Sequence, residues 1–189
     1  RHAQVVDDER DPPPAEIAPH HAAYGTACSI RPMTRMRAAY ADRYGGPDVV
    51  RIRDVERPTP TGDELLVRVR AASVNRADLD GLKPKPGFLR LFMGLRAPRN
   101  HGVGIDAAGV VEAVGPEVAR FKPGDEVMTD LFAAGRFGAF AEYVCAREKA
   151  FERIPTGMPF EEAATLPHSA VLAIQALRPL HLERKSATG

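Results

Sequence analysis

Residues 100–127 read NHGVGIDAAGVVEAVGPEVARFKPGDEV, and this stretch decides the fold class. The apolar run between Gly109 and Gly115 has the length of a short strand, about six residues. The Lys-Pro-Gly-Asp corner at 122–125 predicts a turn, and a second strand is expected to begin at Glu126. Short strands joined by glycine and proline turns are typical of a small barrel.

The sequence on either side extends this pattern. Upstream, it predicts an apolar strand, a Tyr-Gly-Gly-Pro turn, a second strand, a proline-rich corner and a third strand. The third strand places Val67 and Val69 on one face and Arg68 and Arg70 on the other, the period of two expected when one face is buried. Another strand is expected within 137–155. We therefore predict a mainly β fold built from antiparallel sheet.

Between these strands, residues 76–102 lose the alternation and contain several prolines and glycines. We expect a loop with a short helical turn. Its apolar residues Phe88, Leu89, Leu91 and Phe92 either form the lip of a pocket or cap the end of the barrel, and the sequence leaves both readings open.

Beyond Gly157 the apolar pattern becomes helical. A helix is expected to start at 158–162, with an early proline and acidic residues in its first turn, and a second near Pro167. In the second helix, Ala170, Ala173, Ile174 and Leu177 recur at a spacing of three and four residues. This stripe is expected to pack on another layer.

Composition argues against several classes of protein. The formal net charge is +1, from 26 basic and 25 acidic residues spread along the chain, so we expect no nucleic-acid partner. The two cysteines, Cys28 and Cys145, lie far apart and suggest neither a disulfide framework nor a thiolate metal site. The longest uncharged apolar stretch, 163–177, has 15 residues, fewer than the roughly 20 needed to cross a bilayer. A soluble, cytoplasmic protein without membrane contact is predicted.

Residues 1–32 differ in composition from the rest of the chain. They contain three consecutive prolines at 12–14, an acidic cluster at 7–9 and no periodic apolar pattern, so a disordered extension is expected. They also lack the apolar core, roughly 7 to 15 residues long, of a signal peptide.

From Met36 to Leu177 the sequence resembles the N-terminal, GroES-like domain of the medium-chain dehydrogenase/reductase superfamily, and most closely its zinc-free quinone oxidoreductase branch. The resemblance rests on five segments in the family's order: DRYGGPDVVRIRDVERPTP, DELLVRVRAASVNRAD, GIDAAGVVEAVGPEVARFKPGDEV, GAFAEYVCA and FEEAATLPHSAVLAIQAL. It implies a distorted barrel at 33–157 that forms the substrate side of a cleft. A Rossmann domain holding NADPH or NADH would form the other side.

The same resemblance addresses zinc. Zinc-using relatives place a cysteine ligand in Val-Cys-x-x-Asp and a histidine ligand in Gly-His-Glu, whereas this chain has VNRAD at 74–78 and GID at 104–106. Neither Asn75 nor Ile105 replaces a thiolate or an imidazole, so no metal is expected. His101, nearby in sequence, is interpreted as a loop or hydrogen-bonding histidine.

The resemblance also supplies candidate site residues. Asn75 is the expected catalytic residue, because the family places an amide donor at this position near the reacting carbonyl. The alternative for Asn75 is an asparagine that bonds loop backbone at a strand end. Asp78 is expected to play a structural hydrogen-bonding role beside it, and Phe88 and Phe92 complete the expected substrate pocket. Leu172 stands where many relatives have a threonine facing the nicotinamide, so no cofactor-binding residue is predicted.

At 158–189 we expect the helical start of a cofactor-binding domain that is itself missing. No glycine lies between Gly157 and Gly189, so the usual pyrophosphate-binding turn has no counterpart. The chain is therefore interpreted as a truncated or frame-shifted product. It would be the substrate-side domain of a zinc-independent, NAD(P)H-dependent reductase of quinones, enones or other small carbonyl compounds, unable to bind the cofactor tightly or to turn over alone. A separate Rossmann domain is a possible partner. The alternative is a non-catalytic binding or interaction module.

Overall fold

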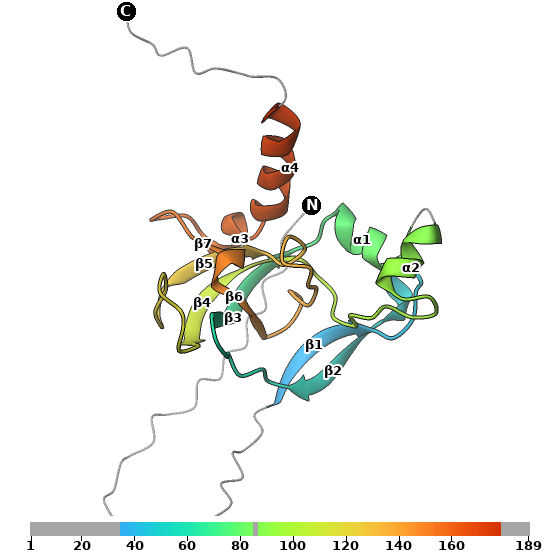
Figure 1. The fold of residues 1–189 in the computed structure, drawn as a ribbon, viewed down its shortest axis with the longest axis horizontal. Coiled ribbons are helices and arrows are strands. Elements are labelled where there is room, and N and C mark those ends of the chain that lie inside the picture. The colour runs from blue at the N-terminus through green and yellow to red at the C-terminus, as the bar shows by residue number, and fades with distance from the viewer. Residues whose placement is uncertain (1–34, 85–86, 179–189) are drawn as a thin grey trace, which may run out of the picture.

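The computed structural model describes residues 35–84 and 87–178, leaving out the side chains of Leu89 and Phe92. The expected disordered extension, 1–32, lies outside these ranges. The described part is mainly β, as predicted (Figure 1). Its strands are β1 (Arg35–Ala41), β2 (Val50–Glu56), β3 (Glu64–Ser73), β4 (Asp106–Val114), β5 (Glu126–Asp130), β6 (Tyr143–Arg147) and β7 (Phe151–Arg153).

The helices are short. They are α1 (Arg76–Leu82), α2 (Arg90–Met93), α3 (Phe160–Ala163) and α4 (Pro167–Leu177), with 3-10 turns at Pro47–Val49, Gly87–Leu89 and Glu148–Ala150. Within the described ranges, none of the helices combines the length and the apolar character that would let it cross a membrane.

Two antiparallel sheets make up the body of the fold. Strands β1 and β2 form a hairpin, and the other strands form a sheet in the order β6-β3-β4-β5-β7. The hairpin joins the remaining structure through the bridges Ala38↔Ala141 and Tyr40↔Gly102. The result is the irregular, rolled arrangement that the sequence predicted (Figure 1).

The prediction for β4 was right about the strand and wrong about its start. The strand begins at Asp106, because residues 106–108 pair with both β3 and β5. Gly109 lies inside the strand, where the register against β3 shifts between Val69 and Ala71. A Cβ at Gly109 would stand 2.1 Å from the carbonyl oxygen of Arg68. The glycine therefore permits a close backbone approach inside the strand and does not end it.

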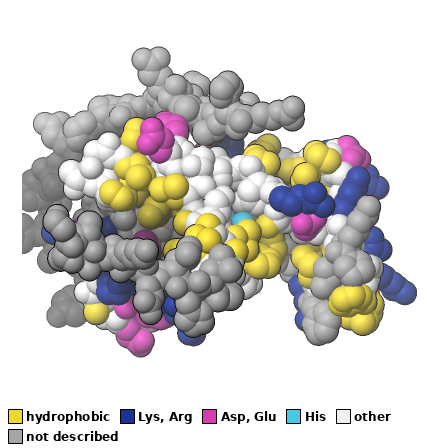
Figure 2. Space-filling view, turned by 90° about the horizontal axis from the view of Figure 1, so that it is seen from above, with side chains coloured by type: hydrophobic (Ala, Val, Ile, Leu, Met, Phe, Trp, Pro, Cys, Tyr) yellow, Lys and Arg dark blue, Asp and Glu magenta, His cyan; other side chains and the backbone are white. Residues whose placement is uncertain are grey.

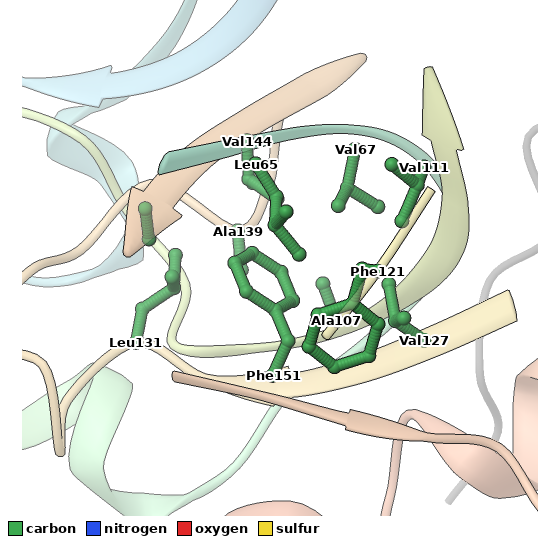
Figure 3. Packing of buried hydrophobic residues seen from close by; sticks show 11 residues of the cluster. Leu65, Val67, Ala107, Val111, Phe121, Val127, Leu131, Ala139, Val144 and Phe151 are labelled. Atoms are coloured by element: carbon green, nitrogen blue, oxygen red, sulfur yellow. The ribbon is translucent and has the colours of Figure 1, made fainter. Parts of the chain in front are cut away.

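The main core lies inside the rolled sheet (Figure 3). Leu65, Val67, Val111, Val127 and Phe151 are each at most 2% exposed and point toward one another from different strands. A second cluster packs α3 on the opposite face, where Ala163 and Ala164 meet β3 and β4. Burial of these apolar surfaces stabilises the sheet and fixes its register.

Helix α4 differs from the rest of the structure. It stands out from the barrel with its N-terminal end toward the sheet (Figure 1), and none of its residues is buried. Leu172, Ile174 and Leu177 are 52%, 57% and 49% exposed. The helix is present as predicted, but within the described residues its apolar stripe packs on no second layer.

Candidate functional site

Polar side chains from four elements meet at one end of the sheet. Strand β4 begins with Asp106 and strand β5 ends with Asp130, and the two residues are paired across the antiparallel ladder. The start of α1 adds Asn75 and Asp78, and the start of α4 adds His168. The pairing of β4 with β5, and the positions at which α1 and α4 begin, therefore bring together residues that are far apart in the sequence.

Asn75 begins α1 as its N-cap. Its backbone is extended, and its side-chain Oδ1 accepts a hydrogen bond of 2.9 Å from the amide of Ala77. In return, Oδ2 of Asp78 accepts a 2.8 Å bond from the backbone amide of Asn75. This reciprocal arrangement satisfies amides that a helix start otherwise leaves without partners.

The other end of the Asn75 amide faces the cluster. Its Nδ2 donates to Oδ2 of Asp106 at 2.9 Å. Because Oδ1 is occupied by Ala77, the amide orientation is set, and Nδ2 keeps a second hydrogen that no described residue accepts. Asn75 itself is half-buried.

Asp78 is 4% exposed and lies beneath Asn75. Its Oδ1 is buried and has no hydrogen-bond partner among the described residues. Burial raises the pKa of this carboxyl, although the amide of Asn75 acts in the opposite direction. Asp78 therefore holds the cap of α1 and also presents an unsatisfied acceptor.

Asp106 is 1% exposed and accepts two hydrogen bonds, from Nδ2 of Asn75 and, at 3.2 Å, from the backbone amide of His168. Burial, with a further contribution from the charge of Asp130, raises the pKa of Asp106 to about 6. The two hydrogen bonds favour the ionised form but do not outweigh burial. Asp106 therefore holds its proton to a higher pH than an ordinary aspartate.

His168 links the cluster to α4. Its Nδ1 lies 3.0 Å from Oδ2 of Asp130, and its ring meets the edge of Phe132 at a centroid distance of 5.7 Å. Oδ1 of Asp130 accepts a 2.8 Å bond from the amide of Phe132. Neither aspartate, nor His168, was predicted from the sequence as a site residue. The available signal was a histidine after the first proline of a helix, which alone points to no chemistry.

A cavity of about 270 Å³ lies beside this cluster. Its walls include Asp78, Leu82, Met93, Val103 and Phe137. In the view from above, hydrophobic side chains gather around a histidine in the middle of the molecule (Figure 2). An apolar cavity with a few polar groups is the usual form of a small-molecule site.

The structure places the predicted site residues differently with respect to this cavity. It brings Asn75 and Asp78 together, and Asp78 contributes to the wall, whereas Asn75 is not among the lining residues. Phe88 is 60% exposed and also lies outside the lining. Phe92 belongs to α2, but its side chain lies outside what the structure describes.

His101 is a hydrogen-bonding loop histidine, as predicted. Its Nδ1 lies 3.3 Å from the carbonyl oxygen of Ala41, and its ring stacks on Tyr40. Among the residues that the structure describes, no group of three or more histidine, cysteine or acidic side chains is arranged to hold a metal ion.

Comparison with known proteins identifies relatives of the whole barrel. The model of the "Alcohol dehydrogenase GroES-like domain" family matches residues 61–156, which is half of the chain. A quinone oxidoreductase of Pseudomonas aeruginosa is 39% identical over 126 residues. A 2-methylene-furan-3-one reductase of Solanum lycopersicum is 34% identical over 163 residues.

Solved structures agree with these matches. The quinone oxidoreductase of Coxiella burnetii superposes with a TM-score of 0.68 at 29% identity, covering 77% of this chain and 45% of that one. A mycobacterial protein complexed with NADPH superposes with a TM-score of 0.61 at 28% identity, covering 78% of this chain and 41% of that one.

The matches cover only part of the relatives. The aligned region is 65% of this chain but 34% of the Pseudomonas protein, and 82% of this chain but 40% of the tomato protein. The chain therefore corresponds to less than half of each of these relatives.

Proposed function

This chain belongs to the alcohol dehydrogenase GroES-like domain family, and on that basis we propose that it forms the substrate side of a zinc-independent, NAD(P)H-dependent oxidoreductase. Its substrates are quinones, enones or other small carbonyl compounds. Relatives named quinone oxidoreductase and 2-methylene-furan-3-one reductase support this substrate class.

The observation that carries the proposal is the fixed amide of Asn75. Reduction of a carbonyl compound adds a hydride, with its electron pair, to carbon, and negative charge develops on oxygen before a proton from solvent completes the product. A donor already oriented toward that oxygen stabilises the charge. Ala77 and Asp106 hold the amide of Asn75 and leave one Nδ2 hydrogen free of described partners, and we assign that hydrogen to the substrate oxygen.

The neighbouring residues would complete the substrate site. Asp78 accepts from the backbone amide of Asn75 and contributes to the cavity wall, and we assign it to hold the start of α1 and to border the substrate. We also propose Phe88 and Phe92 as substrate-pocket residues, because they belong to the segment that follows α1.

Residue chemistry supports zinc independence. Asn75 is committed to hydrogen bonds, and Ile105 is fully buried and apolar. Zinc is normally held by thiolate, imidazole or carboxylate ligands. Polarisation of the carbonyl is therefore assigned to the amide of Asn75.

The cofactor would be supplied by another domain. A structural relative complexed with NADPH supports this dinucleotide, which provides the hydride when bound. The described residues contain no glycine-rich turn between a strand and a helix, the usual cradle for a pyrophosphate. We therefore assign none of them to the pyrophosphate, and place the start of the cofactor-binding part at residue 158, with a separate Rossmann domain as the partner.

The experiment mixes the chain with a separately produced Rossmann domain from a relative and follows NADPH oxidation in the presence of a quinone. We expect oxidation only when both proteins are present, and calorimetry should show no tight binding of NADPH to this chain alone. The Asn75→Ser variant should lower kcat by roughly 100-fold, while serine keeps the helix cap. Unchanged turnover by Asn75→Ser would refute the role of the amide. Quinone binding without NADPH oxidation by the mixture would favour a non-catalytic binding module.

A further inference from the structure

Helix α4 is held to the barrel mainly at its first turn. No residue of the helix is buried. The hydrogen bonds between α4 and the sheet come from His168, whose backbone amide donates to Asp106 and whose ring contacts Asp130. Within the described residues, these polar contacts hold the first turn of α4 together with the ring contact to Phe132 and the chain connection to α3.

Asp106 connects those contacts to Asn75. One carboxylate oxygen accepts from Nδ2 of Asn75 at 2.9 Å, and the other accepts from the amide of His168 at 3.2 Å. The residue is 1% exposed and is held in the β4–β5 ladder opposite Asp130. Because the carboxylate is planar and enclosed, a shift at one oxygen changes the geometry at the other.

We propose that Asp106 is a positioning residue that couples the direction of α4 to the orientation of the Asn75 amide. The functional meaning of the coupling rests on the proposed role of Asn75 in carbonyl reduction, but the coupling itself is a property of the folded chain. Through it, whatever repositions α4 also turns the amide hydrogen that is assigned to the substrate.

The electrostatics of the cluster support this link. The groups facing Asp106 are Asn75 from the start of α1, Asp130 from β5 and His168 from α4. Burial raises the pKa of Asp106 to about 6. Protonation introduces a hydroxyl hydrogen where two N–H donors already converge, so it weakens one of the two bonds.

The test uses the full chain and NMR signals of the Asn75 side-chain amide. His168→Ala removes the imidazole and keeps the backbone donor, whereas His168→Pro removes both. Proline is tolerated in the first turn of a helix, and Cα shifts of residues 170–177 report whether α4 persists. We expect hydrogen exchange at Nδ2 of Asn75 to be about fivefold faster in His168→Pro than in His168→Ala, the change expected for one weakened hydrogen bond. If hydrogen exchange at Nδ2 of Asn75 and the chemical shifts of its side-chain amide are the same in the two variants, the coupling is refuted.

A second variant decides the matter if proline disrupts the helix. The two donors bond to different oxygens of Asp106, and Asp106→Asn replaces one of these oxygens with an NH2 group, which cannot accept from either donor. We expect the NMR signals of the Asn75 side-chain amide and of the His168 backbone amide both to change their chemical shifts in this variant. The pH response of Asn75, with a midpoint near 6 in the wild type, should disappear. If only one of the two signals moves, or if the midpoint persists, the proposal fails. These readouts need neither substrate nor cofactor, so they are independent of the turnover experiment.

Discussion

Asp106 makes the stability of the chain depend on pH in an unusual direction. Folding raises the pKa of its carboxyl from 3.8 to about 6 through burial and the charge of Asp130. The folded state therefore binds a proton more tightly than the unfolded state. The resulting stabilisation is complete below pH 3.8 and is lost as pH rises toward 6.

We predict that Asp106→Asn removes this dependence. The wild type should lose stability, on the order of 2 kcal/mol relative to the variant, as pH rises through this window. Urea unfolding of both proteins from pH 4 to pH 7 gives the free energy of unfolding at each pH. The difference between the wild-type and the variant values measures the contribution of Asp106. The subtraction cancels Asp125 and Glu142, whose lowered pKa values act in the opposite direction at more acidic pH. Parallel curves would contradict the prediction.

Cys145 should be a poorly reactive thiol. Burial, together with the negative charge of Glu64, raises its pKa to about 11. At pH 8 the thiolate fraction is then on the order of 100-fold lower than that of a free cysteine. Alkylation by iodoacetamide should slow by about the same factor. Cys28→Ser leaves Cys145 as the sole thiol of the chain, and in that background Glu64→Gln should accelerate the reaction. If Cys145 reacts with iodoacetamide as fast as a short cysteine peptide does, the predicted rise in its pKa is wrong.

Site residues that lie close together in the sequence could be predicted, whereas site residues that meet only in the folded structure could not. Asn75 and Asp78 were reachable because the Asn-x-x-Asp spacing is local and matches a family position. Asp106, Asp130 and His168 were not, because they meet only once β4 and β5 pair in one register and α4 starts beside them. A sequence pattern shows which face a strand buries but does not give the partner opposite each residue.

Among the larger elements, the turn after the long loop depends on one glycine. Gly104 has φ +94, and a Cβ there would lie 2.5 Å from the Phe140 ring and 2.7 Å from the Phe140 backbone nitrogen. Its carbonyl also accepts from Gly138 and Ala139. Both the backbone conformation and the space therefore require glycine.

We predict that Gly104→Ala destabilises the chain by about 3 kcal/mol, because strain and crowding add. Gly124→Ala is the matched control: its φ is +92, but nothing lies within 4 Å of the added Cβ. It should cost about 1 kcal/mol. Chemical denaturation of both variants gives the comparison, and equal losses would show that crowding at Phe140 contributes nothing.

The alternation of apolar and polar residues predicted some of the strands but not all of their limits. Alternation identified β3, and the Pro-Gly corner identified the turn into β5. Glycine next to an apolar run was interpreted as a boundary, yet Gly109 continues β4 through a register shift. The distinction depends on the Arg68 carbonyl of the neighbouring strand, which no local pattern contains.

For the molecule as a whole, the apolar surface is divided between a closed core and an open helix. Phe151 and Leu65 are fully buried, whereas Leu172, Ile174 and Leu177 on α4 are about half exposed. The helical spacing predicted the helix correctly, but spacing alone does not supply a layer for its apolar stripe to cover. Exposed apolar side chains that lie along one helix form a surface that binds other apolar groups.

We predict that α4 makes the isolated chain bind hydrophobic dyes and self-associate at high concentration. The double variant Leu172→Gln and Ile174→Gln should reduce dye fluorescence and shift sedimentation toward the monomer. Its unfolding free energy should change by no more than about 0.5 kcal/mol, since neither side chain contributes to a core. Gln175→Ala, at another exposed position on the same helix, is the control and should leave both measurements unchanged. If the double variant keeps the dye signal of the wild type, the apolar surface lies elsewhere. If instead the variant loses several kcal/mol, α4 packs against the barrel in solution, and the coupling through Asp106 acts on a docked helix.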